Sequence, residues 1–201
     1  SEMCIRDRSK ILISGYYGFA NAGDEAMLTA IIESLRQVEK NVELTVLSGN
    51  PEDTAAKHQV CSVYRFNPLG IIRAMKDSEL IISGGGSLLQ DVTSKRSLLY
   101  YLSIIGLGKF FGKKVMLFAQ GIGPIRAKWA RKLTSLVCNE ADLITVRDSE
   151  SAAELIEMGV KPEKITVTAD SVLSLNPVTK ECGQYLLQEA GVDLTKPVIG
   201  I

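Results

Sequence analysis

Short apolar runs alternate with longer helical patterns along most of this chain, and this alternation limits the folds open to it. From Lys10 onward, seven runs have the composition of strands. They are Ile11–Ser14, Val42–Leu47, Val60–Tyr64, Leu80–Ser83, Val115–Ala119, Leu143–Val146 and Ile165–Thr168. Val115–Ala119 is apolar throughout and Leu80–Ser83 nearly so, which indicates strands buried on both faces. The pattern predicts an α/β fold with a doubly wound, mostly parallel, Rossmann-like sheet.

Helical spacing follows several of these strands. Met27, Ile31, Leu35 and Val38 recur at spacings of four, four and three residues, so they share one face of a helix. The sequence predicts further helices at Leu98–Phe111, Ala127–Asn139, Ser149–Met158 and Glu181–Ala190, with Gly159 as a helix C-cap.

The chain divides into three parts. Residues 1–8 show neither strand alternation nor a helical stripe, and we expect a non-native or disordered leader there. Residues 9–176 form the predicted Rossmann-like domain. Residues 177–201 contain a linker, a helix and, at Lys196–Ile201, a strand that we expect to open a truncated second domain.

Composition excludes several classes of function. Lys plus Arg and Asp plus Glu both number 23, so no overall charge attracts nucleic acid. The 4 cysteines form no CxxC pair, which argues against a zinc site or a disulfide framework and favours a reducing compartment. The only histidine, His58, lies in a polar run and is predicted to be exposed, so neither a metal site nor a Ser-His-Asp triad is expected.

Ligands of open parallel sheets bind beyond the carboxyl ends of the strands, where loops meet helix N-termini. Five predicted loops lie on that edge, and they are rich in Gly, amide side chains, Arg and Asp. They are GYYGFANAGDE (15–25), GGGSLLQD (84–91), QGIGP (120–124), TVRDS (145–149) and ADS (169–171). Together they predict a pocket for a small anion.

Each loop also has a purely structural interpretation. Glycines can serve tight strand-to-helix turns, and Asp24, Asp148 or Ser149 can cap helices. Three consecutive glycines, Gly84–Gly86, lose more conformational entropy on folding and favour close approach of the backbone to a ligand.

Two common phosphate motifs are absent. Gly18 and Gly23 have the spacing of a P-loop, but two carboxylates follow where Lys-Ser or Lys-Thr is needed. Gly121 and Gly123 lack the third glycine of a dinucleotide fingerprint. Neither a nucleoside triphosphate nor NAD is therefore expected, and no cofactor is predicted.

Arg147 is the most informative cation, because it ends a strand and its planar guanidinium can hold a phosphate or carboxylate through two hydrogen bonds. The alternative is an internal ion pair with Asp148 or Asp170. A second basic cluster follows the QGIGP loop and fits a solvated helix face or, as an alternative, a lipid head group or diphosphate. It comprises Arg126, Lys128, Arg131 and Lys132.

The ordered motifs GYYGFANAGDEAM, ISGGGSLLQDVTS, AQGIGP, TVRDSESA and TADSVL resemble those of the polysaccharide pyruvyl transferase family, in particular its cell-surface-anchoring (CsaB-type) branch. The resemblance covers about Lys10 to Asn176. It implies the N-terminal half of a two-domain protein of the GT-B type. The implied reaction moves a pyruvyl group from phosphoenolpyruvate, a co-substrate, onto a sugar of a cell-surface polysaccharide or its lipid-linked precursor.

The resemblance also implies the residues of the site. Arg147 takes the place of the family arginine associated with phosphoenolpyruvate, and Asp24 is the second catalytic candidate, with Asp91 and Asp170 as alternatives for orienting sugar hydroxyls. Further histidines and lysines of the family come from its second domain, so we expect this stretch alone to be inactive. The expected location is cytoplasmic, with peripheral contact at the inner face of the membrane. The predicted binding residues are Gly18, Asn21, Gly23, Gly85, Gly86, Ser87, Gln120, Gly121, Gly123, Asp170 and Ser171.

Two other functions stay open at this point. A GT-B glycosyltransferase would use a nucleotide sugar and bind its diphosphate in a second domain. A catalytically silent sugar-binding module would need no proton-transfer groups, which agrees with the single histidine.

Overall fold

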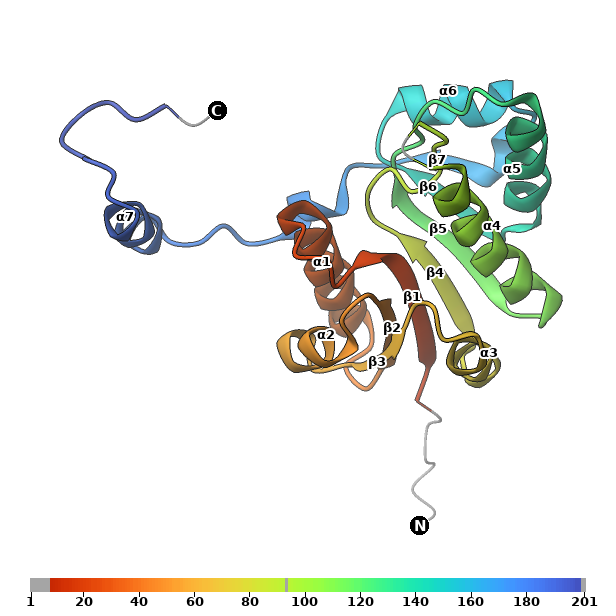
Figure 1. Cartoon of the computed structure of the whole chain (residues 1–201), viewed down its shortest axis with the longest axis horizontal. Coiled ribbons are helices and arrows are strands. Elements are labelled where there is room, and N and C mark those ends of the chain that lie inside the picture. Colours follow the sequence, from red (N-terminus) through yellow and green to blue (C-terminus); the bar gives the residue numbers. More distant parts are fainter. Residues whose placement is uncertain (1–7, 93, 200–201) are drawn as a thin grey trace, which may run out of the picture.

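The computed structural model describes residues 8–92 and 94–199 and confirms the predicted seven-stranded parallel sheet (Figure 1). The strand order is β3-β2-β1-β4-β5-β6-β7. The strands are β1 (Lys10–Tyr17), β2 (Glu43–Ser48), β3 (Cys61–Tyr64), β4 (Leu80–Gly84), β5 (Lys114–Gln120), β6 (Leu143–Val146) and β7 (Ile165–Val167). This is a doubly wound, Rossmann-like arrangement.

Seven α-helices and two short 3-10 helices accompany these strands in the described part of the chain, and η2 and α7 follow the last strand. The α-helices are α1 (Ala22–Val38), α2 (Pro51–His58), α3 (Pro68–Asp77), α4 (Lys95–Phe110), α5 (Lys128–Glu140), α6 (Ser149–Glu157) and α7 (Lys180–Glu189). The 3-10 helices are η1 (Pro162–Lys164) and η2 (Ser171–Ser174). The five predicted helices are confirmed within a few residues at each end.

Helices α2 and α3 are absent from the sequence-based prediction. Each begins with Asn-Pro: the Asn50 side chain accepts a hydrogen bond from the Asp53 amide, and Asn67 accepts one from Gly70. A proline in the first helical turn needs no donor there, so the Asn-Pro pair was the signal for both helix starts.

The core lies on both faces of the sheet because successive strand residues point to opposite sides. Ile13 lies beside Val46 and Ile82 and packs with them against the apolar face of α1. The neighbouring Leu12 belongs to the larger cluster on the other face, which α3, α4, α5 and α6 help to form. Two-sided burial explains the continuous apolar runs of the central strands.

Three predictions about local structure have clear outcomes. Gly159 ends α6 as predicted, but it lies one residue after the C-cap, Met158: its φ is +96°, and Val160 N–H donates to Leu155 O over 3.0 Å. The exposed position predicted for His58 is wrong: its side chain is 10% exposed and lies against Glu25. The Arg36 guanidinium fixes the C-terminal end of α2 against α1 by donating hydrogen bonds to the carbonyls of His58 and Gln59.

The C-terminal part of the chain differs from its prediction in one element. Lys196–Ile199 form no strand, and they pair with no strand among the described residues, so the backbone ladder that defines a strand is missing. The last two residues, 200–201, lie outside the described residues, as does most of the predicted leader, 1–7. The predicted domain boundaries stay predictions.

Candidate functional site

The strand order reverses between β1 and β4, which lie side by side although two other strands separate them in sequence. At such a switch point the loops after the two strands diverge to opposite faces and leave a crevice at the carboxyl edge. A cavity of about 360 Å³ lies there. Its lining residues are Tyr16, Asn21, Asp24, Ser87, Leu88, Gln90, Ser97 and Tyr101.

Asn21 and Asp24 enter this cavity from the start of α1. Asn21 is the helix N-cap, because its Oδ1 accepts hydrogen bonds from the amides of Gly23 and Asp24. The structural interpretation of Asp24 as the cap is therefore wrong, and its carboxylate is left for the cavity. Burial, reinforced by neighbouring Glu25, raises the pKa of Asp24 above its usual range.

The three glycines that end β4 are explained by packing against the protein itself. A Cβ on Gly84 would lie 2.8 Å from Ile31 Cδ1, and one on Gly85 3.1 Å from Tyr17 Oη. Gly86 has a φ of +66°, and a Cβ there would lie 2.9 Å from Asp24 Oδ1. Contacts within the protein thus account for Gly84 and Gly85, which bring β4 under α1, while Gly86 lies against Asp24 of the cavity wall. The ligand contacts predicted for Gly85 and Gly86 stay predictions.

The loops after β4 and β5 are joined into one rigid wall. The Gly121 amide donates to Gly86 O over 3.1 Å, and the Gly123 amide donates to Leu89 O over 3.1 Å. Leu89 also forms a parallel bridge with Ile122. These bonds fix the position of Ser87 relative to the β5 loop.

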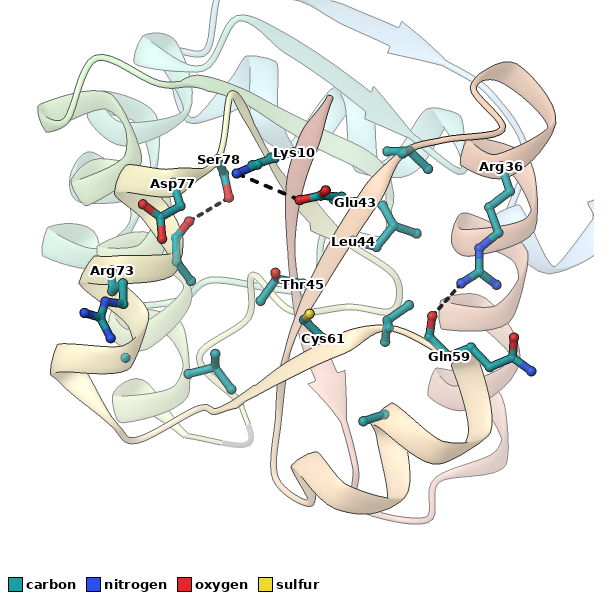
Figure 2. Close-up of a pocket in the computed structure, with 16 residues that line it drawn as sticks. Lys10, Arg36, Glu43, Leu44, Thr45, Gln59, Cys61, Arg73, Asp77 and Ser78 are labelled. Carbon is teal, nitrogen blue, oxygen red and sulfur yellow. Dashed lines mark hydrogen bonds and ion pairs between the residues drawn. The ribbon is translucent and has the colours of Figure 1, made fainter. Parts of the chain in front are cut away.

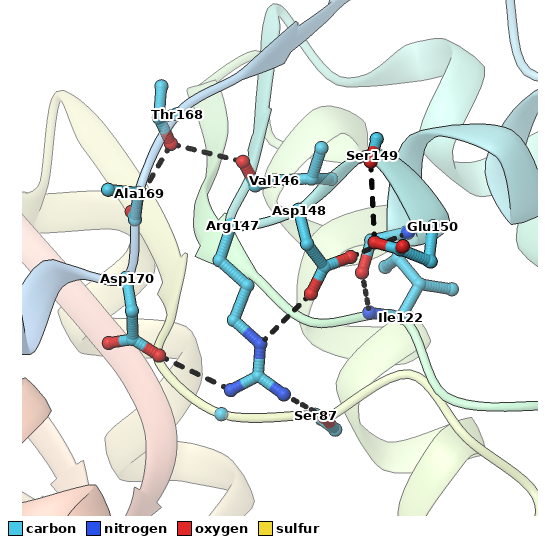
Figure 3. Close-up of polar contacts among 12 residues, drawn as sticks. Ser87, Ile122, Val146, Arg147, Asp148, Ser149, Glu150, Thr168, Ala169 and Asp170 are labelled. Atoms are coloured by element: carbon cyan, nitrogen blue, oxygen red, sulfur yellow. Dashed lines mark hydrogen bonds and ion pairs between the residues drawn. The ribbon is translucent and has the colours of Figure 1, made fainter.

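Arg147, directly after β6, reaches this wall (Figure 3). Its Nη2 donates to Ser87 Oγ over 3.2 Å, its Nη1 lies 3.3 Å from Asp170 Oδ2, and its Nε lies 3.4 Å from Asp148 Oδ2. The internal ion pairs considered as an alternative thus form with both aspartates. The side chain still keeps 34% of its surface exposed.

Gly121 leaves room for the Arg147 guanidinium at the carboxyl edge because it has no side chain. A Cβ at Gly121 would lie 2.7 Å from Cζ, Nε and Nη2 of Arg147, so no other residue leaves this space. Asp148 also caps α6 by accepting from the Ser151 amide over 2.7 Å, as predicted. The hydrogen bonds from Ser151, with Arg147, lower the pKa of Asp148.

Asp170 and Ser171 belong to a segment that crosses from β7 back to α1. Asp170 accepts from the Val172 amide over 3.1 Å and starts η2, which packs against α1. In Figure 1 this segment runs from the β7 end of the sheet to the end of α1 near the carboxyl edge. The chain after the last strand thus links the Arg147 side of the rim to the Asp24 side.

The remaining predicted residues lie on the same edge but serve mainly as support. Gln120 is fully buried and donates to Ser83 Oγ over 3.0 Å. Gly18 has a φ of +77°, and a Cβ there would clash with the backbone amide of Asn50 at 2.5 Å. Gly23 has open space around it apart from the Asn21 cap. Their predicted ligand contacts stay predictions.

Two charged residues that the sequence suggests for the site bind partners outside the switch-point cavity. Asp91 accepts from the amides of Arg126 and Ala127 at the start of α5, and these bonds lower its pKa. Arg131 lies between Glu154 and Glu157 at 2.6 and 3.1 Å. Neither group faces the switch-point cavity.

A larger cavity, about 690 Å³, lies around the amino ends of β1, β2 and β3 (Figure 2). Arg36 on its wall is committed to backbone carbonyls, and Lys10 lies 3.9 Å from Glu43. Ligands of parallel sheets bind at the opposite edge, beyond the carboxyl ends of the strands. The Arg147 guanidinium and the loops after β4 and β5 lie at that carboxyl edge as well. We therefore place the candidate site at the smaller cavity.

Sequence reasoning missed the aromatic part of the site. Tyr16 and Tyr101 line the cavity, and Arg65, directly after β3, lies behind them. The signal was available for Tyr16, which stands in the first rim loop, but Tyr101 lies inside a helix and reaches the site only through packing. Within residues 8–92 and 94–199, no group of three potential metal ligands occurs. In the same ranges no helix combines the length and apolar character needed to cross a membrane.

Comparisons with known proteins agree with this architecture. Residues 21–185 match the family model of polysaccharide pyruvyl transferases. No curated protein matches the sequence. Among solved structures, Anabaena Alr3699/HepE in complex with UDP and glucose has a TM-score of 0.59 at 14% identity, over 92% of this chain and 50% of that chain.

Two further structures have the same fold at low identity. A glycosyltransferase from Rickettsia africae has a TM-score of 0.56 at 11% identity, over 95% of this chain and 52% of that one. A putative UDP-N-acetylglucosamine 2-epimerase from Listeria monocytogenes has a TM-score of 0.52 at 13% identity, over 89% and 51%. The chain thus spans about half the length of the structures it resembles.

Proposed function

Since the chain belongs to the polysaccharide pyruvyl transferase family, we propose that it forms the donor side of an enzyme that transfers a pyruvyl group from phosphoenolpyruvate to a sugar. The finer resemblance to the cell-surface-anchoring branch belongs to this proposal, as does an acceptor that is part of a polysaccharide or its lipid-linked precursor. We also propose that the enzyme acts in the cytoplasm, at the inner face of the membrane.

The observation that carries the proposal is the setting of Arg147. Its guanidinium is partly exposed at the carboxyl edge, lies over Gly121 and donates to Ser87. Its present partners are the carboxylates of Asp148 and Asp170, and an incoming phosphate or carboxylate can replace either one with similar geometry. An arginine with exchangeable anionic partners suits a small, multiply charged donor.

The reaction needs charge stabilisation and two proton transfers. The vinyl carbon of phosphoenolpyruvate gains a proton, its central carbon forms bonds to two sugar hydroxyl oxygens, and the C–O bond to phosphate breaks. Each hydroxyl loses a proton; one of the two protons reaches the vinyl carbon and the other the departing phosphate, so the products are the sugar ketal and inorganic phosphate. Arg147 would stabilise the departing phosphate charge, a role worth about 2.7–4 kcal/mol per donor in comparable sites.

Asp24 suits the acceptor hydroxyl. It lines the same cavity as Ser87, and its raised pKa makes it a better base than an exposed carboxylate. The hydrogen-bonded Gly86 and Gly121 form a glycine wall, with Asp24 against Gly86 on the α1 side and Arg147 against Gly121 on the β6 side. The proposed proton acceptor, Asp24, is thus separated from the cation, Arg147.

The test is the release of phosphate from phosphoenolpyruvate with and without a sugar acceptor, with mass spectrometry of the sugar to find the pyruvate ketal. The full-length enzyme should release phosphate only with acceptor. Arg147→Ala should lower the rate about 10²–10³-fold, because one charge-stabilising donor is lost. The matched control is Arg131→Ala, which also breaks two ion pairs to carboxylates but lies away from Ser87. An unchanged rate in Arg147→Ala would exclude the role given to this residue.

A nucleotide-sugar glycosyltransferase is the second candidate. Its support is the fold shared with HepE, whose solved complexes contain UDP and glucose. It predicts that UDP-glucose raises the melting temperature of the full-length protein while phosphoenolpyruvate does not. A silent sugar-binding module predicts stabilisation by sugar alone and no release of phosphate.

A further inference from the structure

Arg65 is a buried cation for which the described residues supply no counter-ion. The residue is 4% exposed, and none of the ion pairs formed by residues 8–92 and 94–199 includes it. Its Nε and Nη1 are buried without hydrogen-bond partners in the same ranges. Burial of a charge without an anion is costly, so this arrangement needs a compensating reason.

Aromatic rings surround the Arg65 guanidinium and offset part of that cost. The Tyr100 ring lies closest, with its centroid 4.4 Å from Arg65 Cζ. Four other rings have centroids between 5.2 and 5.8 Å from the same atom, within the range of cation–π attraction. They belong to Tyr16, Phe19, Phe66 and Tyr101.

Tyr101 connects this cation to the switch-point cavity. Its hydroxyl accepts a hydrogen bond from Arg65 Nη2 over 3.3 Å, and Tyr101 lines the cavity. The proton of that hydroxyl is donated to no acceptor among the described residues. Burial raises the pKa of Tyr101, so the hydroxyl stays protonated and remains a donor. A donor polarised by a positive charge binds an anionic oxygen more strongly than a neutral one.

The same cavity contains an acceptor for hydroxyl groups. Asp24 lies on its wall, with the amides of Asn21 and Gln90 nearby. A ligand that satisfies both walls has an anionic group for Tyr101 and hydroxyls for Asp24. At about 360 Å³ the cavity is within the size range of small-ligand pockets.

We infer that this cavity binds a sugar bearing an anionic group, a phosphate ester or carboxylate, with the anion on the Tyr101 hydroxyl and Arg65 as the positioning residue behind it. The inference rests on the proposed function only in calling this sugar the acceptor. Arg147 and the loops around it would then bind the donor. The two arginines would serve two different anions on opposite sides of the glycine wall.

The experiment compares binding of N-acetylglucosamine 1-phosphate and of N-acetylglucosamine by calorimetry. The wild-type chain should prefer the phosphorylated sugar by roughly tenfold or more, the gain typical of a hydrogen bond to a charged group. Arg65→Met and Tyr101→Phe should each reduce this preference to about twofold or less. Arg73→Met, which removes an equal charge from an exposed position on α3, should leave it unchanged.

Three outcomes overturn the inference. They are a wild-type chain that does not distinguish the two sugars, a preference that survives in Tyr101→Phe, and a loss of phosphoenolpyruvate affinity in Tyr101→Phe while sugar-phosphate affinity is kept. Tyr101→Phe removes only one oxygen, so it keeps the test valid if Arg65→Met disturbs the aromatic cluster, which near-ultraviolet circular dichroism would reveal. Binding preference is independent of pyruvyl transfer, so failure of the proposed function leaves this test intact.

Discussion

Two arginines at the carboxyl edge of the sheet are held in opposite ways. Arg147, after β6, lies between the carboxylates of Asp148 and Asp170 and is partly exposed. Arg65, after β3, is buried among aromatic rings, with no carboxylate partner in the described chain. Arg147 can exchange its partners with an incoming anion, whereas Arg65 is fixed and transmits its charge through Tyr101. In our proposals, Arg147 therefore serves the donor side of one site and Arg65 the acceptor side.

The largest effect is expected at the carboxylate between these two arginines. Asp24→Asn removes the proposed base and should lower the rate of pyruvyl transfer about 10²–10⁴-fold. In the wild type, activity should rise with pH as Asp24 loses its proton, above the usual carboxyl range because its pKa is raised. This acidic limb should be missing from the residual activity of Asp24→Asn.

Stability should change in the opposite direction at Asp24. A raised pKa means that the folded state binds the proton more tightly than the unfolded state, so stability is greatest below the unfolded pKa and falls as pH rises through the folded one. Asp24→Asn should therefore unfold at a higher temperature than the wild type at pH 7. A variant that is both less stable and fully active would contradict the assignment of Asp24 to the acceptor side.

The next largest effect tests the seat of Arg147. Gly121→Ala places a Cβ 2.7 Å from the guanidinium and must displace it. We expect a fall in rate of about 10–100-fold, since small displacements of a catalytic group are costly. Gly106→Ala is the matched control, because a Cβ at Gly106 meets nothing within 4 Å. It should keep full activity and gain about 0.5–1 kcal/mol in stability from better helix propensity.

A smaller effect is expected at Ser87, which we assign to the donor side. It lines the cavity and accepts from Arg147 Nη2. Ser87→Ala removes one hydrogen bond, worth about 0.5–1.5 kcal/mol, so the KM for phosphoenolpyruvate should rise roughly two- to tenfold. Steady-state kinetics would measure this, and the preference for the phosphorylated sugar should not change. A loss of that preference alone would join Ser87 to the acceptor side.

The smallest effect on activity is expected at the amino edge. Burial alone would raise the pKa of Asp142, but hydrogen bonds from Lys109, the Val115 amide and Lys114 outweigh it and lower the pKa to about 2. This contribution to stability is present above the unfolded carboxyl pKa and is lost as pH falls toward about 2. Asp142→Asn should cost about 1 kcal/mol at pH 7 in chemical denaturation, after allowance for solvent screening, with no change in rate.

The sequence predicted the edge of the site better than its interior. Arg147 and Gly121 follow strands directly and Ser87 lies three residues after β4, so the strand pattern alone placed them on one edge. Tyr101 lies in the second turn of α4, and its position depends on how that helix packs on the sheet. The cation–aromatic contacts of Arg65 join β3, α4 and the loop after β1, and no local pattern encodes such a three-way contact.

Two misjudged residues show the same limit. His58 lies in a polar run, but at the end of α2 its side chain packs against Glu25 of α1. Its neighbours in sequence therefore give no indication of its burial. The glycine run favours a ligand close to the Gly84 backbone, but in the structure the group that approaches Gly84 is the Ile31 side chain. The sequence can require close contact at a glycine without naming the partner.

A crystal structure of the chain with phosphoenolpyruvate would show directly which group binds the donor. We expect the donor's phosphate or carboxylate to lie within hydrogen-bond distance of the Arg147 guanidinium, with the ion pair of Asp148 or of Asp170 broken. Phosphoenolpyruvate bound instead at the amino-edge cavity, or against Tyr101 with both ion pairs of Arg147 intact, would contradict this expectation.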